Sequence, residues 1–146
     1  MSMDKLLLDT SYFIAYLNNN DVNHEKALKL SEKIKEYEAV ITDYIFDELI
    51  TFLIYHVNKN YAVKVAKLIL EKVKEGELNI FLVDWEVFVN AINYLVKYER
   101  KLSFTDCTTL SSMDKLSTQF LLSFDRDFDN INLLKSGKRV INIRYL

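Results

Sequence analysis

The chain has few of the residues that make tight turns, disulfides or thiolate metal sites. Its 146 residues include 0 Pro, 2 Gly and 1 Cys. Barrels and sandwiches built from many short strands need more turn residues than this, so the composition argues against an all-β fold. The one cysteine, Cys107, can form neither an internal disulfide nor, by itself, a zinc site.

Long apolar runs are missing as well. A membrane-spanning helix needs about 18 consecutive apolar residues. The longest apolar neighbourhood, residues 80–96, is interrupted by Asp84, Glu86, Asn90 and Asn93. Near the N-terminus the apolar run covers only residues 6–8, which is too short for a signal peptide. Together with the lone cysteine, these absences predict a cytoplasmic protein without membrane contact.

The chain also lacks an excess of charge of one sign. There are 19 basic and 21 acidic residues, giving a net charge of −2. The basic excess typical of nucleic-acid-binding domains is therefore absent. The hydrophobic fraction of 50% and the charged fraction of 27% are ordinary for a globular protein and argue against disorder. At this length, and without repeats, we expect one domain over residues 1–146.

Short apolar runs alternate with helical patterns along the chain. Apolar runs predict strands at residues 5–8, 38–41, 78–83, 119–124 and 140–143. Apolar residues at helical spacing predict helices over residues 10–17, 22–37, 44–57, 61–74, 85–98 and 106–115. Strands separated by helices predict an α/β fold, namely a three-layer α/β/α sandwich with a mostly parallel sheet of about five strands.

Acidic residues follow several of the apolar segments. Asp9 follows the run at residues 6–8, and Asp125 follows the strand predicted at 119–124. Asp106 follows the apolar stretch 102–105 and is expected to open a helix. Parallel strands end at one edge of a sheet, where ligands bind, so these carboxylates are expected to lie close together. Glu48 lies about one turn into its helix and can reach back to the same edge.

Each of these acids also has an ordinary structural explanation. Asp9 and Asp106 can cap helices, Glu48 can be a solvated helix residue, and Asp125 can be a turn residue. Four carboxylates in one crevice, however, repel one another unless a cation offsets their charge. Oxygen ligands alone favour Mg²⁺ or Mn²⁺ over zinc. The pattern therefore indicates a site for one or two such ions.

Four short motifs occur in a fixed order along the chain. They are LLLDTS at residues 6–11, ITDYIFDEL at 41–49, LSFTD at 102–106 and SFDRDF at 123–128. In this order and spacing they resemble the motifs of PIN-domain ribonucleases, specifically the VapC-like toxins of type II toxin–antitoxin systems. The resemblance covers nearly the whole chain. It departs at Cys107, where the family usually has alanine; we expect this cysteine to pack in the core.

The resemblance implies an activity and the residues that carry it. It implies metal-dependent hydrolysis of RNA phosphodiester bonds that leaves 5′-phosphate and 3′-hydroxyl ends. Asp9, Asp106 and Asp125 would hold one or two Mg²⁺ or Mn²⁺ ions, and Glu48 would ligate a metal or orient the attacking water. The fourth motif offers Asp127 and Asp129 beside Asp125. The side chains expected to support the acids are those of Thr10, Ser11, Ser123 and Asp127.

The resemblance also implies protein partners. It predicts a homodimer and a cognate antitoxin, with the helices over 22–37 and 44–74 near the antitoxin groove and the dimer interface. RNA is the expected substrate. If the four motif acids are set aside as a metal site, the 19 basic residues outnumber the remaining acidic ones. The slightly negative total is therefore compatible with a nucleic-acid enzyme whose site is neutralised by cations.

Other classes of protein fit the sequence less well. A haloacid-dehalogenase-like phosphatase has a second Asp two residues after the first, where Ser11 stands. A response-regulator receiver needs an acidic pair at the first strand end, and only Asp9 is there. Neither histidine lies near a Ser or Cys motif, and no glycine-rich phosphate loop occurs. Two alternatives stay open: a PIN-like RNA- or protein-binding module without catalysis, and a non-toxin PIN nuclease in RNA processing.

Overall fold

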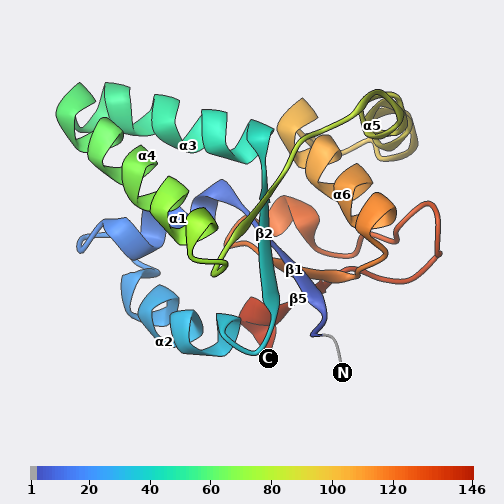
Figure 1. Cartoon of the computed structure of the whole chain (residues 1–146). Coiled ribbons are helices and arrows are strands. Elements are labelled where there is room, and N and C mark those ends of the chain that lie inside the picture. Colours follow the sequence, from blue (N-terminus) through green and yellow to red (C-terminus); the bar gives the residue numbers. More distant parts are fainter. Residues whose placement is uncertain (1–2) are drawn as a thin grey trace.

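A five-stranded sheet lies between two layers of helices in a computed structural model, which describes residues 3–146 (Figure 1). The strands are β1 (Lys5–Leu8), β2 (Glu38–Thr42), β3 (Asn79–Phe81), β4 (Phe120–Leu122) and β5 (Ile141–Asn142). They lie in the order β3-β2-β1-β4-β5, and every neighbouring pair is parallel. The predicted α/β sandwich with a parallel sheet is confirmed.

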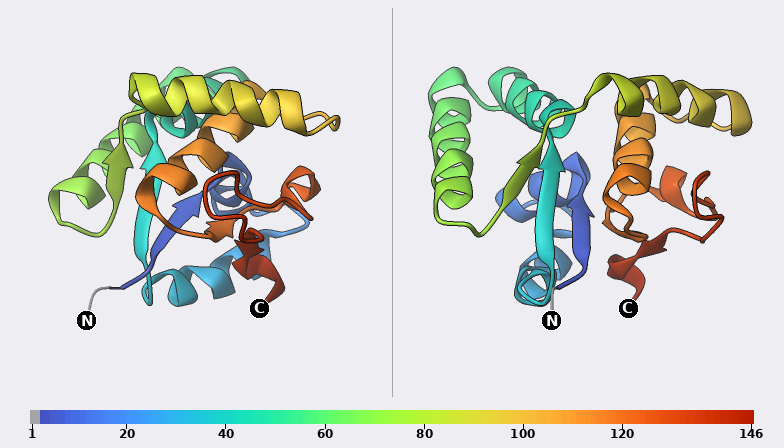
Figure 2. Two further views of the ribbon diagram at one scale, coloured as in Figure 1. Left: turned by 90° about the vertical axis from the view of Figure 1, so that its right-hand side faces the viewer. Right: turned by 45° about the vertical axis from the view of Figure 1, so that its right-hand side comes forward.

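Helices cover both faces of this sheet. They are α1 (Thr10–Leu17), α2 (His24–Ile34), α3 (Asp43–His56), α4 (Lys59–Lys74), α5 (Trp85–Lys97) and α6 (Phe104–Leu116). Two short 3₁₀ turns follow β4 and β5: η1 (Arg126–Phe128) and η2 (Ile143–Tyr145). Helices α1 to α4 lie on one side of the sheet, and α5 and α6 lie on the other (Figure 2).

Alternate residues of the central strand point into two separate cores. Leu6 and Leu8 belong to the core under α1 to α4, whereas Leu7 belongs to the core under α5 and α6. All three side chains are buried. A strand buried on both faces must be apolar at every position, which is why this segment reads as a continuous apolar run. Cys107 is buried in the second core, as expected, and burial raises the pKa of its thiol to about 11.

Several element boundaries differ from the prediction. The expectation that Asp106 opens its helix is wrong, because α6 begins at Phe104 and Ser103 is its N-cap. The Ser103 side chain accepts from the Asp106 backbone N–H while the Asp106 carboxylate accepts from the Ser103 N–H, which forms a capping box. Strand β3 spans only three residues of the predicted 78–83. Gly76 has a φ of +80°, as expected for the left-handed end of α4.

The order of the strands fixes where a ligand can bind. From β1 the chain proceeds to β2 and β3 on one side, and later returns to place β4 and β5 on the other. The carboxyl ends of β1 and β4 are therefore adjacent, with Leu8 paired to Leu122 and the Asp9 N–H bonded to the Leu122 carbonyl at 3.0 Å. This topological switch point is where open α/β sheets bind their ligands.

Within residues 3–146 no helix combines the length and the apolar character needed to cross a membrane.

Candidate functional site

Asp9 lies at the switch point, directly after β1. It is the N-cap of α1 and is 4% exposed. One of its carboxylate oxygens, Oδ2, accepts from Ser11 Oγ at 2.6 Å, from Ser123 Oγ at 2.8 Å and from the Ser11 N–H at 3.3 Å. Oδ1 has no donor in the described part of the chain. Burial raises the pKa of Asp9 despite these hydrogen bonds, and the nearby Asp125 raises it further.

Asp106 enters the same crevice from the first turn of α6. The capping box holds its Oδ2 against the Ser103 N–H at 3.0 Å. Burial is the main cause that raises the pKa of Asp106 to about 7, and the charges of Asp9 and Asp125 act in the same direction. A carboxyl group with this pKa has no nearby cationic side chain that compensates its charge.

Asp125 and Asp127 come from the loop that follows β4. Carboxylate oxygens of Asp106, Asp125 and Asp127 all lie within 4.8 Å of one another. Asp125 caps η1 by accepting from the Asp127 N–H at 2.8 Å, and its charge is the main cause that raises the pKa of Asp127. Asp129, which the sequence left as an alternative, instead binds the Tyr145 hydroxyl at 2.8 Å.

Glu48 lies on α3, outside the group of three carboxylates that converge within 4.8 Å but near enough to be influenced by the charges of Asp9 and Asp125. The residue is exposed, but its carboxyl group is partly enclosed by protein, which raises its pKa; Asp9 and Asp125 add to this effect. The Thr10 hydroxyl acts in the opposite direction and lowers that pKa. No hydrogen bond of ordinary geometry joins the two, however, because Thr10 Oγ1 is buried and has no hydrogen-bond partner among residues 3–146.

The donor set of this crevice suits a hard divalent cation. Five acids contribute only oxygen atoms, and none of them takes part in the ion pairs found within residues 3–146. The Thr10 hydroxyl oxygen, Oγ1, is buried and has no hydrogen-bond partner within residues 3–146. It is a further oxygen that a bound cation or its water could satisfy. Mg²⁺ and Mn²⁺ prefer carboxylate, hydroxyl and water oxygens, so the residues present fit these ions.

Sequence reasoning missed one residue that holds the site in place. Asn142 lies on β5, is buried, and hydrogen-bonds the backbone of Ser123 through its side chain. The available signal was a polar residue inside the apolar run 140–143, because a buried amide needs partners.

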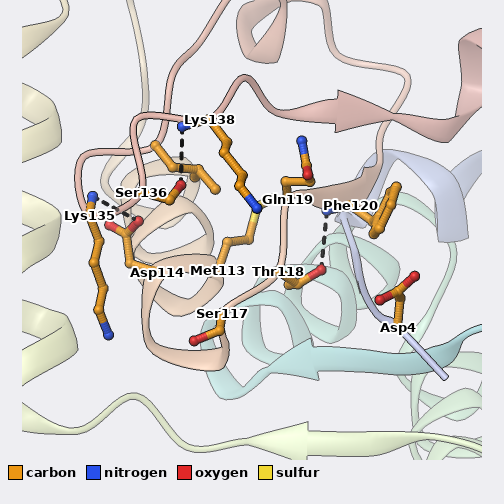
Figure 3. Close-up of a pocket in the computed structure, with 11 residues that line it drawn as sticks. Asp4, Met113, Asp114, Ser117, Thr118, Gln119, Phe120, Lys135, Ser136 and Lys138 are labelled. Carbon is orange, nitrogen blue, oxygen red and sulfur yellow. Dashed lines mark hydrogen bonds between the residues drawn. The ribbon is translucent and has the colours of Figure 1, made fainter. Parts of the chain in front are cut away.

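A separate pocket of about 400 Å³ lies at the opposite edge of the sheet (Figure 3). It borders the starts of β1 and β4, near Asp4 and Thr118, and contains none of the five acids. Two of its hydroxyls accept hydrogen bonds from the backbone: Thr118 Oγ1 from the Phe120 N–H at 3.2 Å, and Ser136 Oγ from the Lys138 N–H at 3.1 Å. The candidate site is the acid cluster at the carboxyl edge, where the metal-type ligands converge.

Known proteins resemble the chain over most of its length. The family model described as PIN domain matches residues 6–134. The crystal structure of Mycobacterium tuberculosis VapC20, a toxin that cleaves the sarcin-ricin loop, is 26% identical with a TM-score of 0.77, over 90% of this chain and 98% of that one. VapBC2 from Rickettsia felis, bound to a DNA fragment from its promoter, is 13% identical with a TM-score of 0.66, over 94% and 98%. No curated protein matches the chain.

Proposed function

The chain belongs to the PIN domain family, and from this we propose that it is a metal-dependent endoribonuclease acting as the toxin of a type II toxin–antitoxin pair. The observation that carries the proposal is the cluster of Asp106, Asp125 and Asp127, whose carboxylate oxygens converge within 4.8 Å beside Asp9 and Glu48. The likeness to a toxin that cleaves the sarcin-ricin loop supports RNA as the substrate. We propose that residues 1–146 act as one domain, in the cytoplasm.

One or two Mg²⁺ or Mn²⁺ ions would be held by Asp9 Oδ1 and by the carboxylates of Asp106, Asp125 and Asp127. A divalent ion bound there lowers the pKa of a coordinated water and stabilises negative charge on the phosphate. The cluster fits this role because burial and neighbouring carboxylates raise the pKa values of Asp9 and Asp106, and Arg100 only partly offsets the charge of Asp127.

The chain's own residues orient these groups. Ser11 and Ser123 donate to the same oxygen of Asp9, which fixes the plane of its carboxylate. Ser103 fixes Asp106 through the capping box. Glu48, an exposed residue of α3, would orient the attacking water through its carboxylate and accept its proton. The partly enclosed position that raises its pKa makes it a better proton acceptor at neutral pH.

RNA cleavage in the presence and absence of metal tests this proposal. The substrate is an RNA oligonucleotide that carries the sarcin-ricin loop, incubated with Mg²⁺, with Mn²⁺ or with EDTA. We expect 5′-phosphate products with either metal, and at least about a hundredfold loss of rate with EDTA or in Asp9→Asn. Asp4→Asn is the matched control, because Asp4 is exposed at the opposite edge of the sheet, far from the cluster, and the variant should retain full activity.

Two results would contradict the nuclease. Cleavage that survives both EDTA and Asp9→Asn would exclude the metal-dependent mechanism. RNA binding without cleavage, combined with no Mn²⁺ binding in calorimetry, would instead favour the non-catalytic PIN-like module. Efficient cleavage of other RNA with no effect on bacterial growth would favour the non-toxin nuclease.

A second copy of the chain is the first proposed partner. The outer face of α5 carries Trp85, Val89, Ile92 and Val96, which are all exposed. Their spacing of four, three and four residues is the apolar seam of a coiled coil, which needs a facing helix to bury it. The helix has acidic residues at its start and a lysine at its end, so antiparallel pairing of two copies brings opposite charges together. We therefore place the dimer interface on α5 rather than on the helices over 22–37 and 44–74.

Ile92→Glu tests this interface, since it puts a charge at the centre of the seam. We expect the variant to be monomeric by light scattering at concentrations where the wild type is a dimer. Leu68→Glu is the matched control, because Leu68 is similarly exposed but lies on α4. A dimer that persists in Ile92→Glu and dissociates in Leu68→Glu would move the interface to α4.

A cognate antitoxin is the second proposed partner. The R. felis relative is VapBC2 bound to a DNA fragment from its promoter, and this chain covers 98% of the chain it matches there, which supports a DNA-binding partner of the antitoxin kind. Helices α2, α3 and α4 remain the surface on which we expect the antitoxin to lie. A small neighbouring gene that encodes a DNA-binding protein would support this partner.

A further inference from the structure

The last strand of the sheet, β5, lies outside the part of the chain that matches the family and contacts the segment that carries Asp125 and Asp127. We propose that Asn142 is a positioning residue that holds Asp9 and Asp125 in place through Ser123. The proposal rests on the nuclease function argued above, but concerns a segment that the PIN match does not contain, because that match ends at residue 134.

The Asn142 side chain binds both backbone groups of Ser123. Its Nδ2 donates to the Ser123 carbonyl at 2.8 Å, and its Oδ1 accepts from the Ser123 N–H at 3.2 Å. The backbone ladder between β4 and β5 has its last pair at Leu121 and Asn142. The Asn142 side-chain amide therefore takes the place of the backbone hydrogen bonds that a further β4–β5 pair would make. It holds the chain at Ser123, two residues beyond the last paired residue of β4. Asn142 is 7% exposed, so both bonds are protected from water.

Ser123 passes this support on to two acids. Its hydroxyl donates to Asp9 Oδ2 at 2.8 Å and accepts from the Asp125 N–H at 2.9 Å. Asp9 and Asp125 come from different strands, and Ser123 Oγ is bonded to both of them. A shift of the Ser123 backbone therefore changes the separation of the two acids.

Two further contacts join residues 142–145 to the loop formed by residues 123–129. The Tyr145 hydroxyl donates to Asp129 Oδ2 at 2.8 Å. The Arg144 guanidinium lies 5.9 Å from the centroid of the Phe124 ring. Residues 142–145 thus contact the loop 123–129 at its start and at its end, with Asp125 and Asp127 between the two points. Asn142 is the member of this group whose contact is buried and leads directly to the acids.

Small displacements of metal-binding acids have large effects on catalysis. Partners that orient metal ligands typically contribute about ten- to a hundredfold to metal affinity or activity. Asn142→Ala leaves the Ser123 N–H and carbonyl without their side-chain partners. We expect about a tenfold weaker Mn²⁺ affinity and about a tenfold lower kcat, with little change in KM because Asn142 does not contact RNA. Asn142→Ser, which can satisfy one of the two groups, should lie between Ala and the wild type.

The matched control is Thr118→Val at the other end of β4. Thr118 is also buried, and its hydroxyl donates to the Lys5 carbonyl at 2.6 Å and accepts from the Phe120 N–H at 3.2 Å. It makes the same kind of side-chain to backbone bonds at the edge far from the acids. We expect it to lower the melting temperature about as much as Asn142→Ala, while Mn²⁺ affinity and kcat stay at the wild-type values.

A double-mutant cycle with Ser123→Ala tests whether Asn142 acts through Ser123. If it does, the double variant loses no more Mn²⁺ affinity than the worse single variant, whereas independent effects multiply. Wild-type Mn²⁺ affinity and kcat in folded Asn142→Ser and Asn142→Ala would overturn the proposal, as would multiplicative losses in the cycle or equal losses in Thr118→Val. A wild type that binds Mn²⁺ but cleaves no RNA contradicts the nuclease function alone, and the calorimetric cycle still decides the role of Asn142.

Discussion

Asp106→Asn is expected to abolish RNA cleavage and, in metal-free buffer at pH 8, to make the protein more stable. Both effects have the same cause. Asp106 is buried beside Asp9 and Asp125, and its pKa of about 7 against an ordinary 3.8 means that its charged form is disfavoured in the folded state. Asn removes this charge and still offers an oxygen to the Ser103 N–H, so the capping box keeps its acceptor.

We expect a rate loss of about 10³-fold, which corresponds to about 4 kcal/mol of lost transition-state stabilisation. The free energy of unfolding at pH 8 should rise by about 2 kcal/mol, with a melting temperature about 5 °C higher. Chemical denaturation and single-turnover cleavage measure the two effects on the same sample. Asp4→Asn, at the opposite edge of the sheet, should change neither. A destabilised Asp106→Asn protein at pH 8 would show that Asp106 supports the fold more than the site.

The metal-free protein is expected to lose stability between pH 5 and pH 8. Asp9, Glu48, Asp106 and Asp127 all have pKa values raised in the folded state. Between the unfolded value of an aspartate and its raised folded value, the folded protein binds more protons than the unfolded chain. The free energy of unfolding therefore falls as the pH rises through this window, which for Asp106 ends near pH 7.

Urea unfolding at pH 5, 6, 7 and 8 without metal measures this dependence. We expect a decrease of about 3 kcal/mol over the range, with Asp106→Asn showing a smaller decrease. Saturating Mn²⁺ should restore stability at pH 8 much more than at pH 5, because the ion binds the deprotonated carboxylates. A free energy of unfolding that rises from pH 5 to pH 8 in the absence of metal would contradict the raised pKa values of the clustered acids.

The sequence predicted the sheet well because its central strands are buried on both faces. Leu6, Leu7 and Leu8 are consecutive apolar residues, a pattern not expected of a strand or helix with one face in water. Asp9, the acid that follows them, marks the carboxyl edge of the sheet. The start of α6 was harder to predict. Residues 102–105 are apolar enough to resemble the end of a strand, but the Ser103 to Asp106 spacing is that of a capping box, and this local signal determines the helix start.

The sequence identifies those residues of the site that directly follow a predicted strand. Asp9 and Asp125 are found in this way, since strand ends share an edge. Asp127 joins them through the 3₁₀ turn η1, whose geometry depends on Asp125 as its cap. Asn142 acts through bonds across nineteen positions of sequence, and such a pairing depends on the register between β4 and β5. Register between two short strands is a tertiary property that the pattern of a single segment does not specify.

The strand order also has a consequence for synthesis. Residues 5–81 supply β1, β2, β3 and the four helices of one face, so that half of the sheet can pair while the rest is still being made. The acid cluster cannot form at that stage, because Ser123 and Asp125, which follow β4, and Asn142 on β5 have not yet been made. The growing chain therefore has no assembled acid cluster while residues 120–142 are still inside the exit tunnel of the ribosome.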